Sequence, residues 1–172
     1  TLFSPSTLKQ ETYVEELKKY IKEVLKIEKY TIEHEEFGII PMSLAKFEQN
    51  PKQNVINIGT SGGYTKASSG YTFQFIQKNV VDIVKNLKTG KNPVQKLSFK
   101  NKIYQWYDRT LINVLLTKKM TGKEVFTIMF KKNPAHKILA FLGNESSISE
   151  DLLIMKSFPK IPFLIAGIKS LK

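Results

Sequence analysis

Residues 59–71 are the part of the chain whose residue types best suit ligand binding. Glycine has no Cβ, so the backbone here can adopt positive φ angles and approach a bound group closely. Hydroxyl and backbone N–H groups can donate hydrogen bonds to an anion or a polar cofactor. The alternative is a glycine-rich turn that binds nothing, because glycine is common at turns. The candidate cofactor-binding residues are Gly59, Thr60, Ser61, Gly62, Gly63, Ser68, Ser69, Gly70 and Tyr71.

Two elements would position this segment. The apolar run Val55–Ile58 predicts a short buried strand before it. The apolar spacing between Tyr71 and Lys88 predicts a helix after it. The first N–H groups of that helix lack intrahelical partners and carry the positive end of its dipole. The glycine spacing matches neither G-x-G-x-x-G nor a P-loop, so it predicts a cofactor site without naming the cofactor.

Few residues could ligate a metal. The chain has no cysteine, which excludes disulfides, cysteine-based metal sites and a catalytic thiol. His34 lies among Glu33, Glu35 and Glu36. On extended backbone, His34 and Glu36 would point to one side and the other two carboxylates to the opposite side. Solvated polar clusters are far commoner than sites with two ligands, so we predict no metal site.

Residues 58–73 resemble the C-terminal motif of the lycopene cyclase family of FAD-dependent proteins. Members of that family carry an Ile-Gly-x-x-Gly-Gly-like turn that leads into a Val-His-Pro-Ser-Thr-Gly-Tyr-like segment. Lys66 and Ala67 replace the His-Pro pair, so the family's use of that histidine is not carried over to this chain. The residues that agree with the motif are Ser68, Gly70 and Tyr71, with Ser69 as a conservative replacement.

Two further stretches resemble the same family. Residues 36–42 read Glu-Phe-Gly-Ile-Ile-Pro-Met and are similar to its Glu-x-Gly-x-Ile-Pro-Met motif, although Ser43 and Leu44 replace the glycines that usually follow. Residues 1–4 are similar to the segment that closes an acidic Glu-x-Thr triplet. On that alignment the glutamate lies just before Thr1. Beyond Leu87 the resemblance is diffuse.

The resemblance implies the C-terminal part of an enzyme that closes the end ring of linear carotenoids, with FAD and without net redox change. A buried carboxyl group with a raised pKa would suit proton delivery to the terminal alkene. The resemblance implies the upstream glutamate as the main acid and Glu36 as a secondary candidate. The dinucleotide-binding unit would lie further upstream, so we expect this fragment alone neither to retain FAD nor to cyclise its substrate.

Two other functions stay open at this stage. One is a related flavoprotein, such as a polyprenyl reductase or an aromatic hydroxylase. The other is a non-enzymatic basic module that binds a membrane surface. The net charge of +12 favours such contacts: residues 1–90 have 12 Lys and 10 acidic residues (+2), whereas residues 91–172 have 14 Lys, Arg109 and 5 acidic residues (+10). A single arginine and no known nucleic-acid motif argue against nucleic acid.

The tail at residues 158–172 combines a short apolar run with lysines. This pattern suits an interfacial anchor, or an ordinary helix packed on the core. No uninterrupted apolar run approaches about 18 residues, so we predict no membrane-spanning helix. We expect a cytoplasmic protein that is peripheral to the inner face of the membrane and contacts anionic lipid.

The fold class predicted from these elements is mixed α and β: strands in the first half and a mostly helical second half, as a fragment of a Rossmann-type flavoprotein fold. We expect residues 1–54 to end a substrate-domain-like segment, residues 55–90 to form the flavin-binding strand, loop and helix, and residues 91–172 to form a basic helical region. The other predicted elements are a helix at 7–26 with a Thr7/Gln10 capping box, a strand at 30–40, a helix at 103–118, a helix capped by Thr121 and Glu124, a helix opened by Asn133 and Pro134, and a turn or helix opened by residues 149–151.

Overall fold

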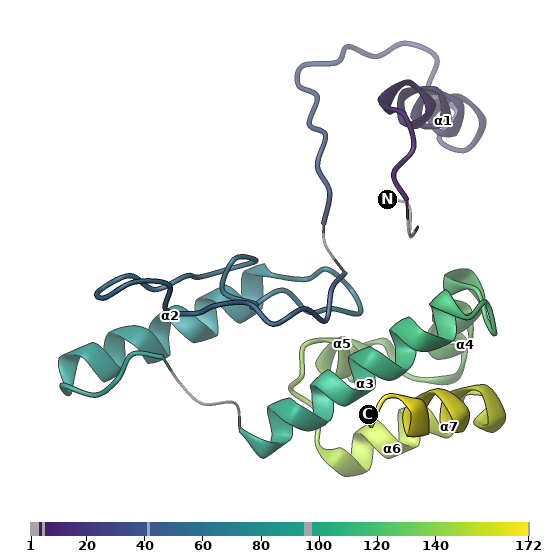
Figure 1. Cartoon of the computed structure of the whole chain (residues 1–172). Coiled ribbons are helices and arrows are strands. Elements are labelled where there is room, and N and C mark those ends of the chain that lie inside the picture. The colour runs from purple at the N-terminus through teal and green to yellow at the C-terminus, as the bar shows by residue number, and fades with distance from the viewer. Residues whose placement is uncertain (1–3, 5, 41, 95–97, 172) are drawn as a thin grey trace. The chain divides into compact units, whose positions relative to one another are not determined.

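The structure is a computed structural model that describes residues 4, 6–40, 42–94 and 98–171. The chain divides into two compact units, Thr1–Ile40 and Pro41–Lys172. The described residues contain seven helices and no sheet, and their only β pairing is an isolated bridge between Lys52 and Val55. The predicted mixed α and β fold class is therefore wrong for this chain, and its strands are absent from the described residues (Figure 1).

The first unit is one helix followed by extended chain. Helix α1 spans Gln10–Glu23, close to the prediction, but Lys9 is its N-cap and no side chain caps it, so the predicted capping box does not form. Residues 28–40 have no regular secondary structure, are exposed and pair with no strand among the described residues. An alternating or apolar sequence favours extended backbone, but a strand also needs a partner for its backbone groups. The predicted strand at 30–40 has no partner among the described residues.

The second unit begins with the loop that contains the glycines. Residues 55–58 form no strand beyond the bridge at Val55, so the second predicted strand is also wrong. Helix α2 spans Phe73–Lys88, two residues later than its predicted start. Gly90 follows it with a φ of 65° and ends it as predicted.

Five helices form the rest of the second unit. They are α3 (Phe99–Leu116), α4 (Gly122–Lys132), α5 (Ala135–Leu142), α6 (Ile148–Met155) and α7 (Lys160–Lys169). The predicted Thr121/Glu124 capping box is confirmed at α4. A second capping box, Ser147 with Glu150, starts α6. Pro134 is the N-cap of α5 rather than its first helical residue.

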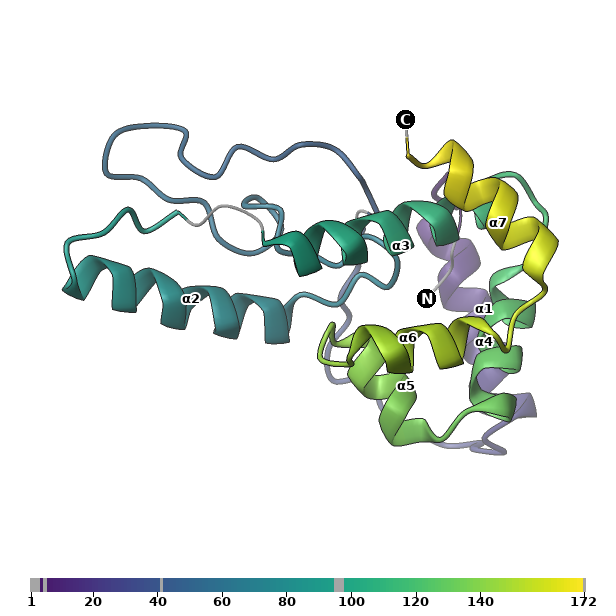
Figure 2. The ribbon, with the colours of Figure 1, turned by 90° about the horizontal axis from the view of Figure 1, so that it is seen from below.

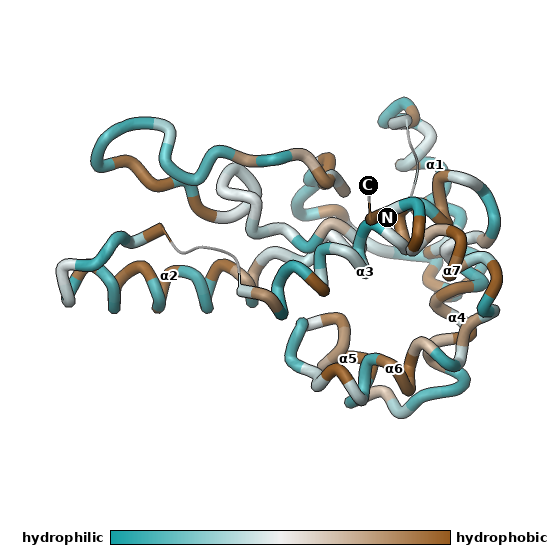
Figure 3. Tube along the Cα trace, turned by 60° about the horizontal axis from the view of Figure 1, so that its bottom comes forward, coloured by the Kyte–Doolittle hydropathy of each residue, from teal (hydrophilic) through white to brown (hydrophobic). Residues whose placement is uncertain are grey.

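The apolar core lies between α4, α5 and α6. It consists of Met129, Ile138, Leu142 and Ile154, all buried. Helix α7 packs mainly on α3, and both views place it there (Figures 1 and 2). Hydrophobic residues also run along α5, α6 and α7 outside this core (Figure 3). The second unit thus consists mainly of packed helices, and it includes the glycine loop.

Candidate functional site

The glycine loop folds as two consecutive turns. In the first turn, the N–H of Tyr64 donates to the carbonyl oxygen of Gly59 at 2.8 Å, with φ angles of 62° at Gly59 and 78° at Gly63. In the second turn, the N–H of Gly70 donates to the carbonyl oxygen of Lys66 at 2.8 Å, with a φ of 74° at Gly70. These positive φ angles explain glycine at all three positions, because other residues are strained there.

Gly62 is required for a different reason. A Cβ added to it would overlap the carbonyl group of Asn57, whose carbon would lie 2.8 Å away. The main chains of residues 57 and 62 therefore pass too close together for any side chain. This glycine is explained by packing inside the loop, and no ligand needs to be invoked for it.

Three threonine hydroxyls link the two turns. The Oγ1 of Thr65 lies 2.8 Å from the Oγ1 of Thr60 and 2.9 Å from the Oγ1 of Thr72. Thr72 is also the N-cap of α2, without a side-chain capping bond to that helix. The chain of hydroxyls therefore ties the loop to the start of α2.

The loop has an exposed rim and a buried base. Thr60, Ser61, Gly63 and Tyr71 are exposed. In the described structure, the N–H groups of Thr60 and Ser61 donate to no acceptor of the chain. Adjacent N–H groups of this kind favour an anion or a carbonyl group as a ligand. The rim therefore leaves N–H donors exposed, and their use by a ligand stays a prediction.

Ser68 and Ser69 do not belong to this rim. Ser68 is 4% exposed, and its hydroxyl donates to the Oδ1 of Asp108 at 2.5 Å. Ser69 is half-buried, and its Oγ accepts the N–H of Tyr71 at 3.4 Å. The structure thus places Ser68 in the base of the loop, where its hydroxyl is already used.

A buried ion pair lies beside Ser68. The Nζ of Lys66 lies 2.8 Å from the Oδ1 of Asp108, and these side chains are 5% and 9% exposed. The same Nζ donates to the Oδ1 of Asn144 at 2.8 Å and lies 5.8 Å from the centre of the Tyr104 ring. Removing two charges from water costs several kcal/mol per ion, so such a pair needs further hydrogen bonds. Ser68 and Asn144 provide them.

Further buried polar groups continue from Tyr104. Its hydroxyl donates to the carbonyl oxygen of Ser146 at 2.8 Å, and the hydroxyl of Ser146 donates to the Oδ1 of Asp151 at 2.5 Å. Asp151 is fully buried, and its Oδ2 has no hydrogen-bond partner among the described residues. Burial raises the pKa of this carboxyl group, and the bond from Ser146 opposes that rise. Burial, with the charge of Asp151, also raises the pKa of Tyr107.

Sequence reasoning missed most of this network. Lys66 departs from the family motif, and the sequence predicts no partner for it. Asp108 falls four residues after Tyr104 in α3, so both can face the buried side of that helix. An acidic residue on an otherwise apolar helix face was the one signal available.

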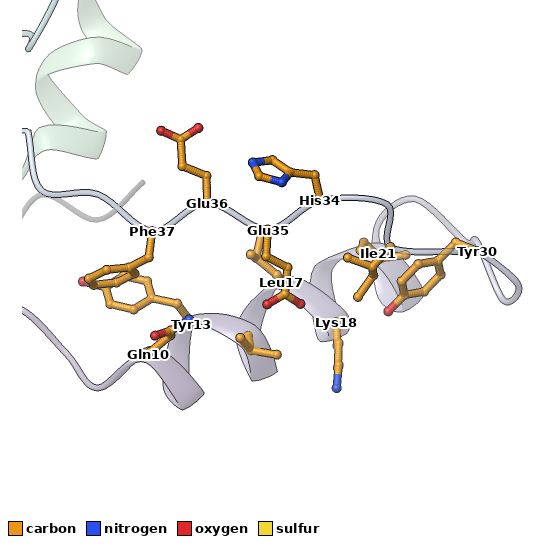
Figure 4. Close-up of a pocket in the computed structure, with 12 residues that line it drawn as sticks. Gln10, Tyr13, Leu17, Lys18, Ile21, Tyr30, His34, Glu35, Glu36 and Phe37 are labelled. Carbon is orange, nitrogen blue, oxygen red and sulfur yellow. The ribbon is translucent and has the colours of Figure 1, made fainter.

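Glu36, the secondary acid candidate, lies in the first unit. Figure 4 shows Glu36 and His34 pointing away from α1, and Glu35 and Phe37 pointing towards it, which is the alternation expected of extended chain. A groove of about 300 Å³ runs between α1 and this segment. Glu36 is exposed. Its proposed role stays a prediction, since its surroundings do not by themselves make it a buried acid.

The remaining site predictions concern metals and residues 1–4. In the described part of the chain, no three His, Asp or Glu side chains are grouped to hold a metal ion. The segment similar to the family's acidic triplet includes Thr1, Leu2 and Phe3, which lie outside the described residues.

The chain was compared with models of protein families, with curated proteins and with solved structures. A model of the lycopene cyclase protein family matches residues 1–167. The chain belongs to the lycopene cyclase protein family. The match extends through the helical second half, where the sequence resemblance was diffuse. Neither the curated proteins nor the solved structures include a match.

Proposed function

We propose that this chain forms the C-terminal part of a lycopene cyclase-type, FAD-dependent enzyme that closes the end ring of linear carotenoids. The observation that carries the proposal is the family match over residues 1–167, together with a glycine loop that presents unused donors. The first unit adds support. Helix α1 buries no residue, and its apolar side chains would be covered by another part of such an enzyme.

The residues of the loop fit a flavin contact at its rim. The N–H groups of Thr60 and Ser61 would donate to polar oxygens or nitrogens of the cofactor, and Tyr71 offers an exposed aromatic ring beside them. Ser68 would not touch the cofactor, since its hydroxyl is held by Asp108. Bound FAD would supply the reduced flavin that supports acid–base chemistry in this family.

The chain's own part in this chemistry would be to hold that rim in place. The ion pair of Lys66 with Asp108 joins the loop to α3, and the bond to Asn144 joins it to the end of α5. The linear carotenoid is the proposed substrate. Glu36 stays a candidate for the acid, as the sequence predicts. We propose a peripheral position at the inner, cytoplasmic face of the membrane, where so apolar a substrate would be found.

Cyclisation leaves the elemental composition of the substrate unchanged, and this separates the proposal from its alternatives. The parent protein expressed in lycopene-accumulating bacteria should give a product of unchanged mass and altered pigment spectrum. A polyprenyl reductase would add two hydrogens per double bond reduced, and a hydroxylase would add an oxygen atom. Unchanged lycopene, with parent protein that is folded and retains FAD, would refute the proposed reaction. The chain alone should show no flavin absorbance.

A further inference from the structure

Helix α7 has two apolar faces, and only one of them is used. On the inner face, Ala166 and Gly167 are buried. The indole N–H of Trp106 in α3 donates to the carbonyl oxygen of Gly167 at 2.9 Å. A Cβ on Gly167 would come within 3.2 Å of the Trp106 ring. The inner face of α7 is therefore an ordinary helix–helix contact, which confirms one of the two interpretations of the tail.

The outer face of α7 is apolar and uncovered. Ile161, Leu164, Ile168 and Leu171 are 72%, 62%, 68% and 71% exposed. Ile161, Leu164 and Ile168 fall on one side of the helix, since successive helical residues turn by about 100°, and Leu171 follows two residues after the helix ends at Lys169. We call these four residues the outer stripe. Exposing a continuous stripe of large side chains is costly unless something covers it.

Lysines border the outer stripe on both sides. On a helical projection Lys160 lies on the Leu164 side of the stripe, and Lys169 falls beyond Ile165 on the other side. Both lysines are exposed, and they belong to the half of the chain whose net charge is +10 (15 basic minus 5 acidic residues). A second copy of α7 placed face to face on the stripe would bring lysines near lysines. The charge pattern therefore favours an anionic surface over self-association.

We propose that the outer stripe of α7 docks on an anionic lipid surface, with the helix lying in the plane of the headgroups. An apolar stripe edged by lysines is the pattern of helices that bind at the membrane interface. Ten residues extend over only about 15 Å, half of the hydrocarbon thickness, so the helix lies on the bilayer. No described helix is long and apolar enough to span a membrane. The proposal specifies which surface makes the peripheral contact proposed above, and it does not depend on the cyclisation reaction.

The test is flotation of the full chain with phosphatidylglycerol/phosphatidylcholine vesicles and with pure phosphatidylcholine vesicles. The wild-type chain should float with the anionic vesicles. Leu164→Ser/Ile168→Ser should lower the partition coefficient by about tenfold or more, because each removed side chain forfeits its burial in the bilayer. The matched control is Val81→Ser/Leu87→Ser, which replaces two exposed apolar residues of α2 and should float like wild type.

A second pair of variants tests the charges. Lys160→Gln/Lys169→Gln should weaken flotation with anionic vesicles and flatten its salt dependence, whereas Lys85→Gln/Lys88→Gln on α2 should do so less. Trp106, the only tryptophan, reports whether α7 stays docked on α3, so unchanged emission shows that a variant is intact.

Three results would overturn the proposal. The first is that the wild-type chain floats with neither kind of vesicle. The second is that the stripe variant Leu164→Ser/Ile168→Ser floats as well as its control, Val81→Ser/Leu87→Ser. The third is a wild-type dimer in gel filtration that the stripe substitutions dissociate without affecting flotation, which would assign the stripe to a second copy. A chain that floats as expected while its parent fails to cyclise carotenoid would leave this inference standing and refute only the proposed function.

Discussion

Replacing Lys66 with methionine tests whether the base of the glycine loop depends on a buried ion pair. The substitution keeps an unbranched side chain but leaves the carboxylate of Asp108, 9% exposed, without its cation. Breaking a buried pair from one side typically costs ~3–5 kcal/mol, because an uncompensated charge stays out of water. That is a large part of the ~5–15 kcal/mol that usually stabilises a domain.

The chain contains a matched exposed pair for comparison. The Nζ of Lys78 also lies 2.8 Å from a carboxylate, that of Glu145, but these side chains are 51% and 48% exposed. Exposed pairs contribute ~0–1 kcal/mol. Lys78→Met should therefore cost at most ~1 kcal/mol although the charge distance is the same, so the comparison isolates burial as the cause.

Urea unfolding followed by Trp106 fluorescence provides the measurement, because Trp106 lies in the same unit as both pairs. A double-mutant cycle with Asp108→Asn adds the coupling energy, and the double variant should recover part of the loss because no unpaired charge remains buried. The asparagine retains an oxygen that can accept the Ser68 hydroxyl. If Lys66→Met and Lys78→Met cost the same, or if the cycle shows no coupling, the reasoning from burial is refuted.

Three further substitutions, with Gly122→Ala as a control, test other parts of the second unit by the same unfolding measurement. Gly62→Ala should lower the free energy of unfolding by more than ~2 kcal/mol, since the added Cβ would meet the Asn57 carbonyl. Gly122→Ala should be neutral or stabilising, because the start of α4 has open space at this position. Equal effects of the two substitutions would contradict the packing argument. Thr121→Ala should cost ~1 kcal/mol through loss of the capping box, and no measurable cost would show that the box is dispensable. Asp151→Asn should stabilise the protein relative to wild type, and increasingly so as pH rises above about 4. The pKa of Asp151 is raised in the folded state, so above this pH the native state holds a proton that the unfolded state has released. The stability of the wild type therefore falls with rising pH until the folded pKa is passed. A pH-independent difference between Asp151→Asn and wild type would show that this carboxyl group titrates normally.

The helices of the second half were predictable because their signals are local. The capping box at Thr121, the glycine after α2 and the apolar spacing of α3 each depend on neighbours within a few residues. The strands failed because a strand depends on a distant partner. Residues 30–40 are predicted as a strand from their sequence, but they have no regular secondary structure and nothing in the described chain pairs with them. The capping-box pattern at Thr7 failed since α1 begins at Gln10 with Lys9 as its cap.

The site shows the same division between local and distant information. Positive φ at Gly59, Gly63 and Gly70 follows from local turn chemistry, and the sequence predicted those turns. The base of the loop is built from contacts 40 and 78 residues apart in sequence, Ser68 with Asp108 and Lys66 with Asn144. No pattern within the motif could have revealed those partners.

Because the base of the loop depends on distant partners, agreement with the family motif does not by itself show which residues contact a ligand. Ser68 agrees with the family motif, yet in this structure its hydroxyl is bonded internally, and the adjacent departure, Lys66, makes the central ion pair. Agreement with a motif therefore does not make Ser68 a ligand contact here, whereas the exposed N–H groups of Thr60 and Ser61 have no internal use in the described structure. If the loop binds a flavin, substitutions at the base should change the stability of the loop and the affinity together. Changes confined to the rim should alter affinity while leaving the unfolding free energy almost unchanged.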